Sequence, residues 1–130
     1  MGKIEIVHED EVEWRPGSSH RRDGQTIRTH SRFPIAHLDP GPWLGSARYE
    51  PHMRVEEHWH PCNEILYITQ GELAVGDTVY KAGTALAIEE GTVYGPLTAG
   101  PEGAEFLTIR DKHPKGLMKP GDSPGGEAKS

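Results

Sequence analysis

The chain has 130 residues, of which 20 are acidic and 14 are basic, and its net charge is −6. This length corresponds to one domain and excludes two full domains. The acidic balance disfavours nucleic acid as the main partner, because phosphate binding needs a basic face. The longest apolar stretches, such as residues 65–68, are far below the ~18–20 residues of a membrane-spanning helix, so we expect no membrane partner.

Glycine and proline are frequent, with 16 and 11 residues respectively. Their share predicts many turns but stays below the ~25–30% that is typical of disorder. The single cysteine, Cys62, excludes an intramolecular disulfide and indicates a reducing compartment. Because residues 1–6 carry no apolar signal segment, we expect a cytoplasmic protein.

The chain is predicted to form short strands separated by turns. Residues 3–7 alternate polar and apolar side chains, which indicates a half-buried strand. Residues 14–32 are polar and rich in arginine, and we interpret them as a loop or arm that wraps around the domain. The sequence Pro-Gly-Pro at 40–42 is a strong break. Further strands are predicted at 43–50, 54–60, 64–69, 72–75, 78–80, 84–88, 92–94 and 105–110.

No stretch shows an amphipathic helical period, so the pattern predicts an all-β barrel or sandwich. The pair Gly76-Asp77 fits a two-residue hairpin loop. We expect three regions: an N-terminal strand and polar arm packed on the barrel at 1–34, the barrel at 35–110, and a mobile C-terminal tail at 111–130.

Two histidines and one glutamate carry the strongest chemical signal. His58 and His60 are two residues apart, so on a strand their imidazoles lie on one face. The chain then bends at 61–63, and Glu64 opens the next strand with its carboxylate directed to the same cavity. Two imidazoles and a carboxylate are typical of a non-haem Fe(II) centre. We therefore expect one divalent transition metal ion, with Fe(II) favoured and Mn, Ni, Cu or Zn as alternatives.

The spacing of these residues resembles the first motif of the cupin superfamily, HxHxxxExxxxxxG, formed here by His58, His60, Glu64 and Gly71. Gly83, Gly91 and Tyr94 fall in the register of the second motif, GxxxxxPxGxxHxxxN. The resemblance spans about residues 48–110 and implies a single-domain cupin-type β-barrel or jelly roll. It also implies that His58, His60 and Glu64 are metal ligands. The chain departs from the family pattern at His52, Glu89, Tyr94 and Thr98.

Tyr94 stands where the family has its third metal-binding histidine, and three interpretations remain open. Its phenolate could coordinate the metal, its hydroxyl could act beside the metal as a hydrogen-bond donor or general acid/base, or its ring could be a packing residue. A free tyrosine has a pKa near ~10, so a phenolate at neutral pH needs the charge of a metal or a nearby base. The second interpretation requires the fewest assumptions.

We therefore predict a metal-dependent cupin enzyme that acts on a small organic molecule, with a dioxygenase as the leading type. The alternatives are a non-redox lyase or isomerase that uses Tyr94 as acid/base, and a non-catalytic ligand-binding or sensor cupin. We also expect a symmetric homodimer, since a core of this size would gain from burying its tryptophans against a partner.

Other residues are given structural roles. Leu66 and Ile68 share the strand face of Glu64 and should line the cavity, whereas Tyr67 should face outward. Cys62 is expected to be an inert thiol. Three arginines are possible clamps for an anionic substrate but are predicted to lie at the surface, namely Arg48, Arg54 and Arg110. Five histidines are predicted to be ordinary surface residues, namely His8, His20, His30, His37 and His113.

Overall fold

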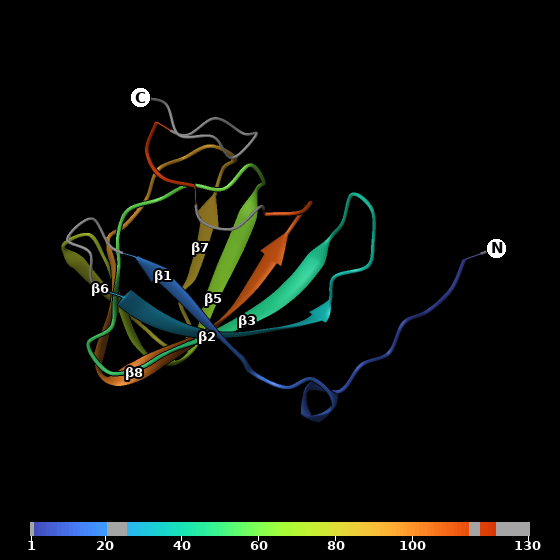
Figure 1. The fold of residues 1–130 in the computed structure, drawn as a ribbon, viewed down its shortest axis with the longest axis horizontal. Coiled ribbons are helices and arrows are strands. Elements are labelled where there is room, and N and C mark those ends of the chain that lie inside the picture. Colours follow the sequence, from blue (N-terminus) through green and yellow to red (C-terminus); the bar gives the residue numbers. More distant parts are fainter. Residues whose placement is uncertain (1, 21–25, 115–117, 122–130) are drawn as a thin grey trace.

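The structure is a computed structural model, and it describes residues 2–20, 26–114 and 118–121. Antiparallel strands curve around a common interior as an all-β barrel (Figure 1). The strand order is β1-β2-β3-β8-β5-β6, with β4 paired to β8 and β7 paired to β5. No helix within these described ranges has the length and apolar character needed to cross a membrane.

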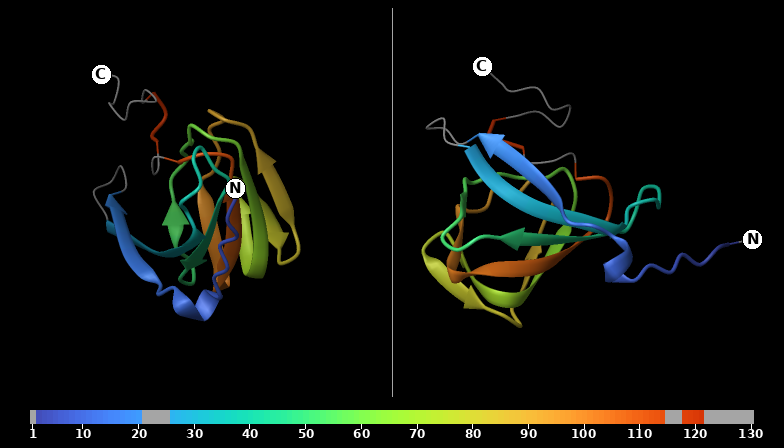
Figure 2. Two further views of the ribbon diagram at one scale, coloured as in Figure 1. Left: turned by 90° about the vertical axis from the view of Figure 1, so that its right-hand side faces the viewer. Right: turned by 60° about the horizontal axis from the view of Figure 1, so that its bottom comes forward.

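Eight strands make up this sheet, and their lengths differ widely. They are β1 (Arg15–His20), β2 (Thr26–Ile35), β3 (Trp43–Tyr49), β4 (Arg54–Val55), β5 (Glu64–Val75), β6 (Thr78–Lys81), β7 (Ala85–Ile88) and β8 (Leu97–Arg110). The two views in Figure 2 place the β1–β2 hairpin on the opposite side of the barrel from β6 and β7.

The two longest strands, β5 and β8, form the wall that carries the site. Their register sets Glu64 opposite Arg110 and Leu66 opposite Thr108. Side chains alternate along β5, with Leu66 buried and Tyr67 43% exposed. The predicted inward and outward faces of this strand are therefore confirmed. Ile68 is also fully buried, where it joins the apolar core.

Gly71 explains why the first motif ends in glycine. Its φ is +73°, in the left-handed region, and a Cβ at this position would collide with the carbonyl oxygen of Gly103 on β8. The β5–β8 register shifts between Gly71 and Leu73. Glycine therefore allows the two long strands to approach closely at a bulge without steric strain.

Several predicted strand boundaries differ from the structure. The segments 64–69 and 72–75 belong to one continuous strand, β5, and β8 begins at Leu97 rather than at 105. Only Arg54 and Val55 of the predicted strand 54–60 form β4, and within 92–94 only Tyr94 makes a bridge. The two-residue hairpin loop at Gly76-Asp77 is confirmed, since Val75 pairs with Thr78 and Gly76 has a φ of +62°.

The N-terminal prediction is wrong in both parts. Residues 3–7 form no strand, and Ile4 and Ile6 are strongly exposed on a segment that extends away from the barrel (Figure 1). The predicted loop at 14–32 instead contains the β1–β2 hairpin, which joins the sheet where β2 pairs with β3. Backbone pairing at the sheet edge thus outweighs a polar composition that strand propensity alone disfavours.

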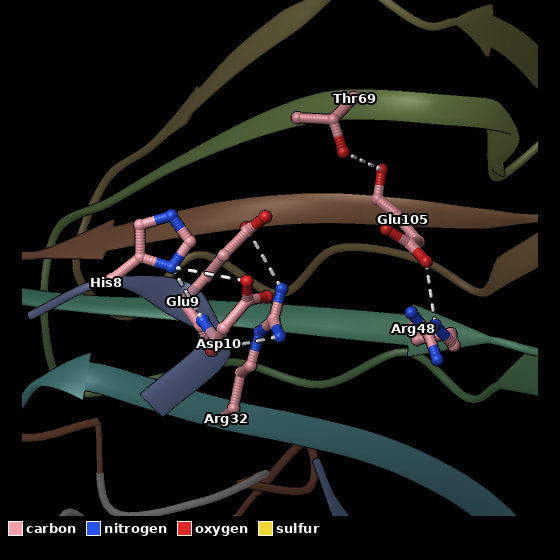
Figure 3. Close-up of polar contacts among 7 residues, drawn as sticks. All are labelled: His8, Glu9, Asp10, Arg32, Arg48, Thr69 and Glu105. Carbon is pink, nitrogen blue, oxygen red and sulfur yellow. Dashed lines mark hydrogen bonds and ion pairs between the residues drawn. The ribbon is translucent and has the colours of Figure 1, made fainter. Parts of the chain in front are cut away.

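Polar contacts on the outer surface hold the short 3₁₀ helix Glu9–Glu11 to the hairpin (Figure 3). Arg32 on β2 donates from Nη2 to Glu9 Oε2 at 3.1 Å. Arg32 and Arg48 also lie over the Trp14 ring, 4.1 and 4.3 Å from its centroid. Arg48 donates from Nε to Glu105 Oε1 at 2.7 Å. These charged residues are structural, because each has a partner on a neighbouring element.

The described part of the C-terminal segment contacts the barrel. Met118 is buried and exchanges two backbone hydrogen bonds with Trp59, at 2.9 and 3.0 Å. The indole of Trp59 also donates to the carbonyl of Lys119 at 3.0 Å. Residues 118–121 are therefore docked by the burial of Met118 and by these hydrogen bonds. The rest of the predicted mobile tail, 115–117 and 122–130, lies outside the described residues, so its mobility stays a prediction.

Candidate active site

A cavity of about 240 Å³ lies inside the barrel. Its apolar lining includes Leu66, Leu97 and Phe106, and a cluster of polar side chains lines the same cavity. Five residues make up this polar cluster, hereafter the central cluster: His58, His60, Glu64, Tyr94 and Arg110. The cavity is smaller than the ~300–1,000 Å³ of pockets for drug-sized ligands, which favours a small ligand.

Local backbone pairing places the two histidines beside Tyr94. His58 and Tyr94 exchange backbone hydrogen bonds of 3.0 and 2.9 Å in an isolated bridge. His58 and His60 are both buried, and their ring centroids are 5.1 Å apart. The prediction that these two imidazoles share one face of the cavity is therefore confirmed.

The protonation state of His58 is set by its surroundings. Its Nδ1 lies 2.9 Å from the carbonyl oxygen of Glu56, so Nδ1 carries the proton and donates to this oxygen. Burial lowers the pKa of His58 to about 4, with the neighbouring His60 as a smaller cause in the same direction. At neutral pH the imidazole is uncharged, and its Nε2 lone pair can accept a proton or a hydrogen bond.

Glu64 is held from two sides inside the barrel. The Tyr94 hydroxyl donates to Oε1 at 2.7 Å, and Arg110 Nε donates to Oε2 at 2.7 Å. Arg110 Nη2 also lies 2.7 Å from Oε2, in an ion pair. Burial by itself would raise the pKa of Glu64, but the charges of Arg110 and His60 and the two hydrogen-bonding groups lower it overall. The carboxylate is therefore ionised, and both of its oxygens have donors.

The Tyr94 side chain lies between the carboxylate and the first histidine. Its ring centroid is 4.6 Å from that of His58. Burial and the negative charge of Glu64 raise the pKa of Tyr94 well above its ordinary value. The side chain is thus a neutral phenol that donates a hydrogen bond to Glu64, and a role of Tyr94 beside a metal or as a general acid/base stays a prediction.

The cluster does not fit the predicted three-ligand metal centre in this arrangement. Among the described residues, no three His, Cys, Asp or Glu side chains are arranged to hold a metal ion. His58 and His60 have a suitable donor chemistry, but the carboxylate oxygens of Glu64 are already engaged by Tyr94 and Arg110. Metal binding by His58, His60 and Glu64 therefore stays a prediction, and it requires Glu64 to exchange its contacts.

Two residues of the cavity were assigned to the surface from the sequence. Arg110 is only 13% exposed at its side chain and contacts Glu64, and His30 lines the cavity from β2. The alternation along β8 was the available signal, because Arg110 shares a strand face with Thr108, which is buried. No signal was available for His30, since its strand was read as a loop.

The other side-chain assignments agree with the structure where it describes them. Arg48 and Arg54 are well exposed and pair with acidic neighbours. Cys62 is buried, and burial raises the pKa of its thiol to about 11, which keeps it protonated and unreactive.

The fold matches several solved structures at low sequence identity. Polyketide cyclase RemF from Streptomyces resistomycificus has a TM-score of 0.69 and 19% identity, covering 94% of this chain and 90% of its own. A Methylibium petroleiphilum protein provisionally described as an acetylacetone dioxygenase has a TM-score of 0.70 and 17% identity, with coverages of 100% and 88%. KdgF from a Halomonas species has a TM-score of 0.63 and 15% identity, with coverages of 83% and 95%.

A further match is an RmlC-like cupin from Ralstonia eutropha, with a TM-score of 0.64 and 17% identity, covering 82% of this chain and 68% of its own. No protein-family model matches the chain, and no curated protein matches it in sequence. The chain therefore has the cupin fold, and the cupin assignment made from the motif is confirmed at the level of the fold.

Proposed function

We propose that this protein is a small-molecule enzyme that transfers protons in the cavity of a cupin barrel, as an isomerase, lyase or cyclase. One observation carries the proposal: the neutral Tyr94 hydroxyl donates at 2.7 Å to an ionised Glu64 that Arg110 holds in place. A neutral imidazole, His58, lies 4.6 Å from the Tyr94 ring, measured between centroids. An uncharged base and a phenolic donor thus face the same small cavity.

These groups suit a substrate with a carbonyl oxygen. The Nε2 lone pair of His58 can take a proton from a carbon next to the carbonyl, and the imidazolium that forms can return it to the product. Tyr94 has a single hydroxyl proton, so it stabilises the developing enolate oxygen by turning this donor from Glu64 Oε1 to that oxygen. Arg110 keeps Glu64 ionised, so the carboxylate orients the phenol. The similarity to a polyketide cyclase supports this class of reaction, although the 19% identity establishes only a shared fold.

The apolar wall limits the substrate to a compact, largely uncharged body. Leu66, Leu97 and Phe106 line the same cavity of about 240 Å³ as the central cluster. Binding in such a cavity excludes water and strengthens the hydrogen bond from Tyr94 to a developing negative charge. We therefore expect small 1,3-dicarbonyl or 2-oxo compounds as the substrate class.

Solvent deuterium exchange tests the proposal without knowledge of the natural substrate. The wild-type protein is incubated in D₂O with small 1,3-dicarbonyl and 2-oxo compounds, with a chelator and without oxygen, and exchange at carbon is followed by proton NMR. We expect catalysed exchange that falls by roughly 10²–10⁴-fold in Tyr94→Phe, the range that acid–base assistance contributes. Thr69→Val, which removes a hydroxyl from the outer surface, is the matched control and should exchange at the wild-type rate.

Two outcomes would contradict this assignment. Exchange at the uncatalysed rate with every compound would remove the enzymatic proposal, and saturable ligand binding under the same conditions would then favour the non-catalytic binding cupin. An exchange rate unaffected by Tyr94→Phe would remove Tyr94 from the chemistry and place the reaction on other groups.

A metal-dependent dioxygenase is the second candidate. Two observations favour it: the paired imidazoles of His58 and His60, and the structural match to the provisionally described acetylacetone dioxygenase. It requires Glu64 to leave Tyr94 and Arg110, or a centre that uses the two histidines without it. Oxygen consumption that depends on added Fe(II) and on a dicarbonyl compound would favour this candidate over proton transfer alone.

A further inference from the structure

Arg110 compensates the charge of Glu64 inside the barrel. Its Nε donates to Oε2 at 2.7 Å and its Nη2 lies at the same distance in an ion pair, while the Tyr94 hydroxyl donates to the other oxygen, Oε1. His58 and His60 face the same cavity with their rings 5.1 Å apart. The residue types of a two-histidine, one-carboxylate site are therefore present, and the arginine engages the carboxylate.

The charges in the cavity disfavour a divalent ion as long as Arg110 is paired with Glu64. Glu64 is the single acidic side chain among the described residues that line it, and Arg110 carries a permanent positive charge. The side chains of this pair are 1% and 13% exposed, so solvent screens them poorly. A divalent ion added beside Arg110 would set three positive charges against one carboxylate, with strong repulsion at low dielectric.

We propose that Arg110 sets the metal dependence of the central cluster by competing with a divalent ion for Glu64. The wild-type cluster then binds divalent ions weakly, because the guanidinium must first leave the carboxylate. A neutral side chain of similar length at position 110 frees Oε2 and completes the two-histidine, one-carboxylate site. This inference goes beyond the proposed function, since it concerns cation binding and requires no substrate.

The experiment is a cobalt titration of the untagged, chelator-treated full chain. Co(II) is followed by its visible absorption bands and by elemental analysis in wild type, Arg110→Met and the double variant Arg110→Met/Glu64→Gln. We expect about one Co(II) per chain in Arg110→Met, with a Kd at least about tenfold below that of the wild type, a difference of ~1.4 kcal/mol. The double variant should lose this gain, because the freed carboxylate is the source of the affinity.

Control variants separate the local effect from a general change in charge. Arg48→Met removes an arginine from the exposed ion pair with Glu105 and should bind Co(II) as weakly as the wild type. Arg110→Lys keeps the positive charge in the cavity and should show no gain. Arg110→Gln keeps a donor for Glu64 but no charge, so it serves as the neutral variant if Arg110→Met does not fold, and a tighter Kd is expected for it too.

Three results would overturn the inference. They are a wild type that binds Co(II) as tightly as Arg110→Met or Arg110→Gln, a gain that persists in the double variant, and an equal gain in Arg48→Met. Failure of the proposed function has a different signature, because deuterium exchange is measured with a chelator present. If the wild type binds Co(II) weakly and catalyses no deuterium exchange, the result supports the role of Arg110 and contradicts the proposed proton-transfer function.

Discussion

Strand β8 contributes one residue to each of two ion pairs. The two pairs have the same N···O distance, but one is exposed and the other is buried. Arg48 and Glu105 meet on the outer face at 2.7 Å, with side chains 47% and 25% exposed. Arg110 and Glu64 meet inside the barrel, also at 2.7 Å, with side chains 13% and 1% exposed. The strand alternation that sends Glu105 outward sends Arg110 inward, so one strand supplies both environments.

The difference shows that burial, rather than distance, gives an ion pair its role here. The outer pair is solvated and screened, so its net contribution is ~0–1 kcal/mol. In the inner pair, each charge compensates the hydration that the other loses on burial, and Arg110 keeps Glu64 ionised beside Tyr94. The inner pair therefore controls the chemistry of the cavity, whereas the outer pair joins two strands.

The largest effect is expected from removing one arginine of each pair. Arg110→Met leaves the buried Glu64 carboxylate without its counter-charge and should lower the free energy of unfolding by about 3–5 kcal/mol. Arg48→Met should lower it by ~1 kcal/mol or less. Urea unfolding at neutral pH measures the free energy of unfolding of both variants. Equal losses in the two variants would contradict the claim that burial distinguishes the two ion pairs.

Acid is expected to destabilise the protein through the buried side chain of His58. The pKa of His58 is depressed to about 4 in the folded state, so between about pH 6.5 and 4 the unfolded chain binds more protons than the folded one. Stability should therefore fall as pH decreases through this window, by up to about 3 kcal/mol from His58.

Urea midpoints at pH 7.5, 6, 5 and 4.5 measure this effect. The lowered pKa of Glu64 acts in the same direction at lower pH, because its stabilisation is lost as pH falls through its folded-state value. His58→Gln should flatten the pH dependence above pH 4.5. An unchanged slope in His58→Gln would contradict the burial of a neutral imidazole.

A smaller effect is expected when one hydroxyl is removed from each environment. Tyr94→Phe leaves Glu64 Oε1 without a donor in the barrel and should cost about 1–3 kcal/mol of stability. Thr69→Val removes a 3.1 Å hydrogen bond to the carbonyl of Glu105 at the exposed surface and should cost about 0.5–1 kcal/mol. Thermal unfolding of both variants tests whether Tyr94→Phe loses more stability than Thr69→Val. A larger loss of stability in Thr69→Val would contradict the prediction.

The smallest effect on folding is expected on the outer face of β5 and β8, where we predict the homodimer contact. Ile65 and Ile109 are 47% and 42% exposed and line an outer groove of about 520 Å³. Ile109→Lys should change stability of the isolated subunit by about 0.5 kcal/mol or less. Light scattering should show a dimer for the wild type and a 14.4 kDa monomer for the variant, and a monomeric wild type would contradict the prediction.

The sequence was most informative where spacing alone defines geometry. The two-residue spacing of His58 and His60 predicted their common face, and the alternation from Glu64 onward predicted the inner and outer sides of β5. Gly76 marked a two-residue hairpin loop, and its φ of +62° agrees with that prediction. These features are local, so they can be read from neighbouring residues.

The sequence was least informative where a partner strand decides the outcome. Residues 15–20 and 26–35 are largely polar, and they form strands by backbone pairing, β1 with β2 and β2 with β3. Arg110 was assigned to the surface because arginine usually lies there, and its inward position depends on Glu64, which is 46 residues away. The alternation along β8 indicates the inward face of Arg110, but a partner that lies far away in the chain cannot be identified from neighbouring residues.

The central claim is that Arg110 keeps the Glu64 carboxylate ionised beside Tyr94. The pKa of Glu64 tests this claim most directly. The side-chain carboxyl carbon of Glu64 is titrated by ¹³C NMR in the wild type and in Arg110→Gln. We predict a pKa below the ordinary glutamate value in the wild type, and an upward shift in Arg110→Gln, where burial acts without the opposing positive charge. A wild-type pKa above the ordinary value, or one that Arg110→Gln leaves unchanged, would contradict the claim.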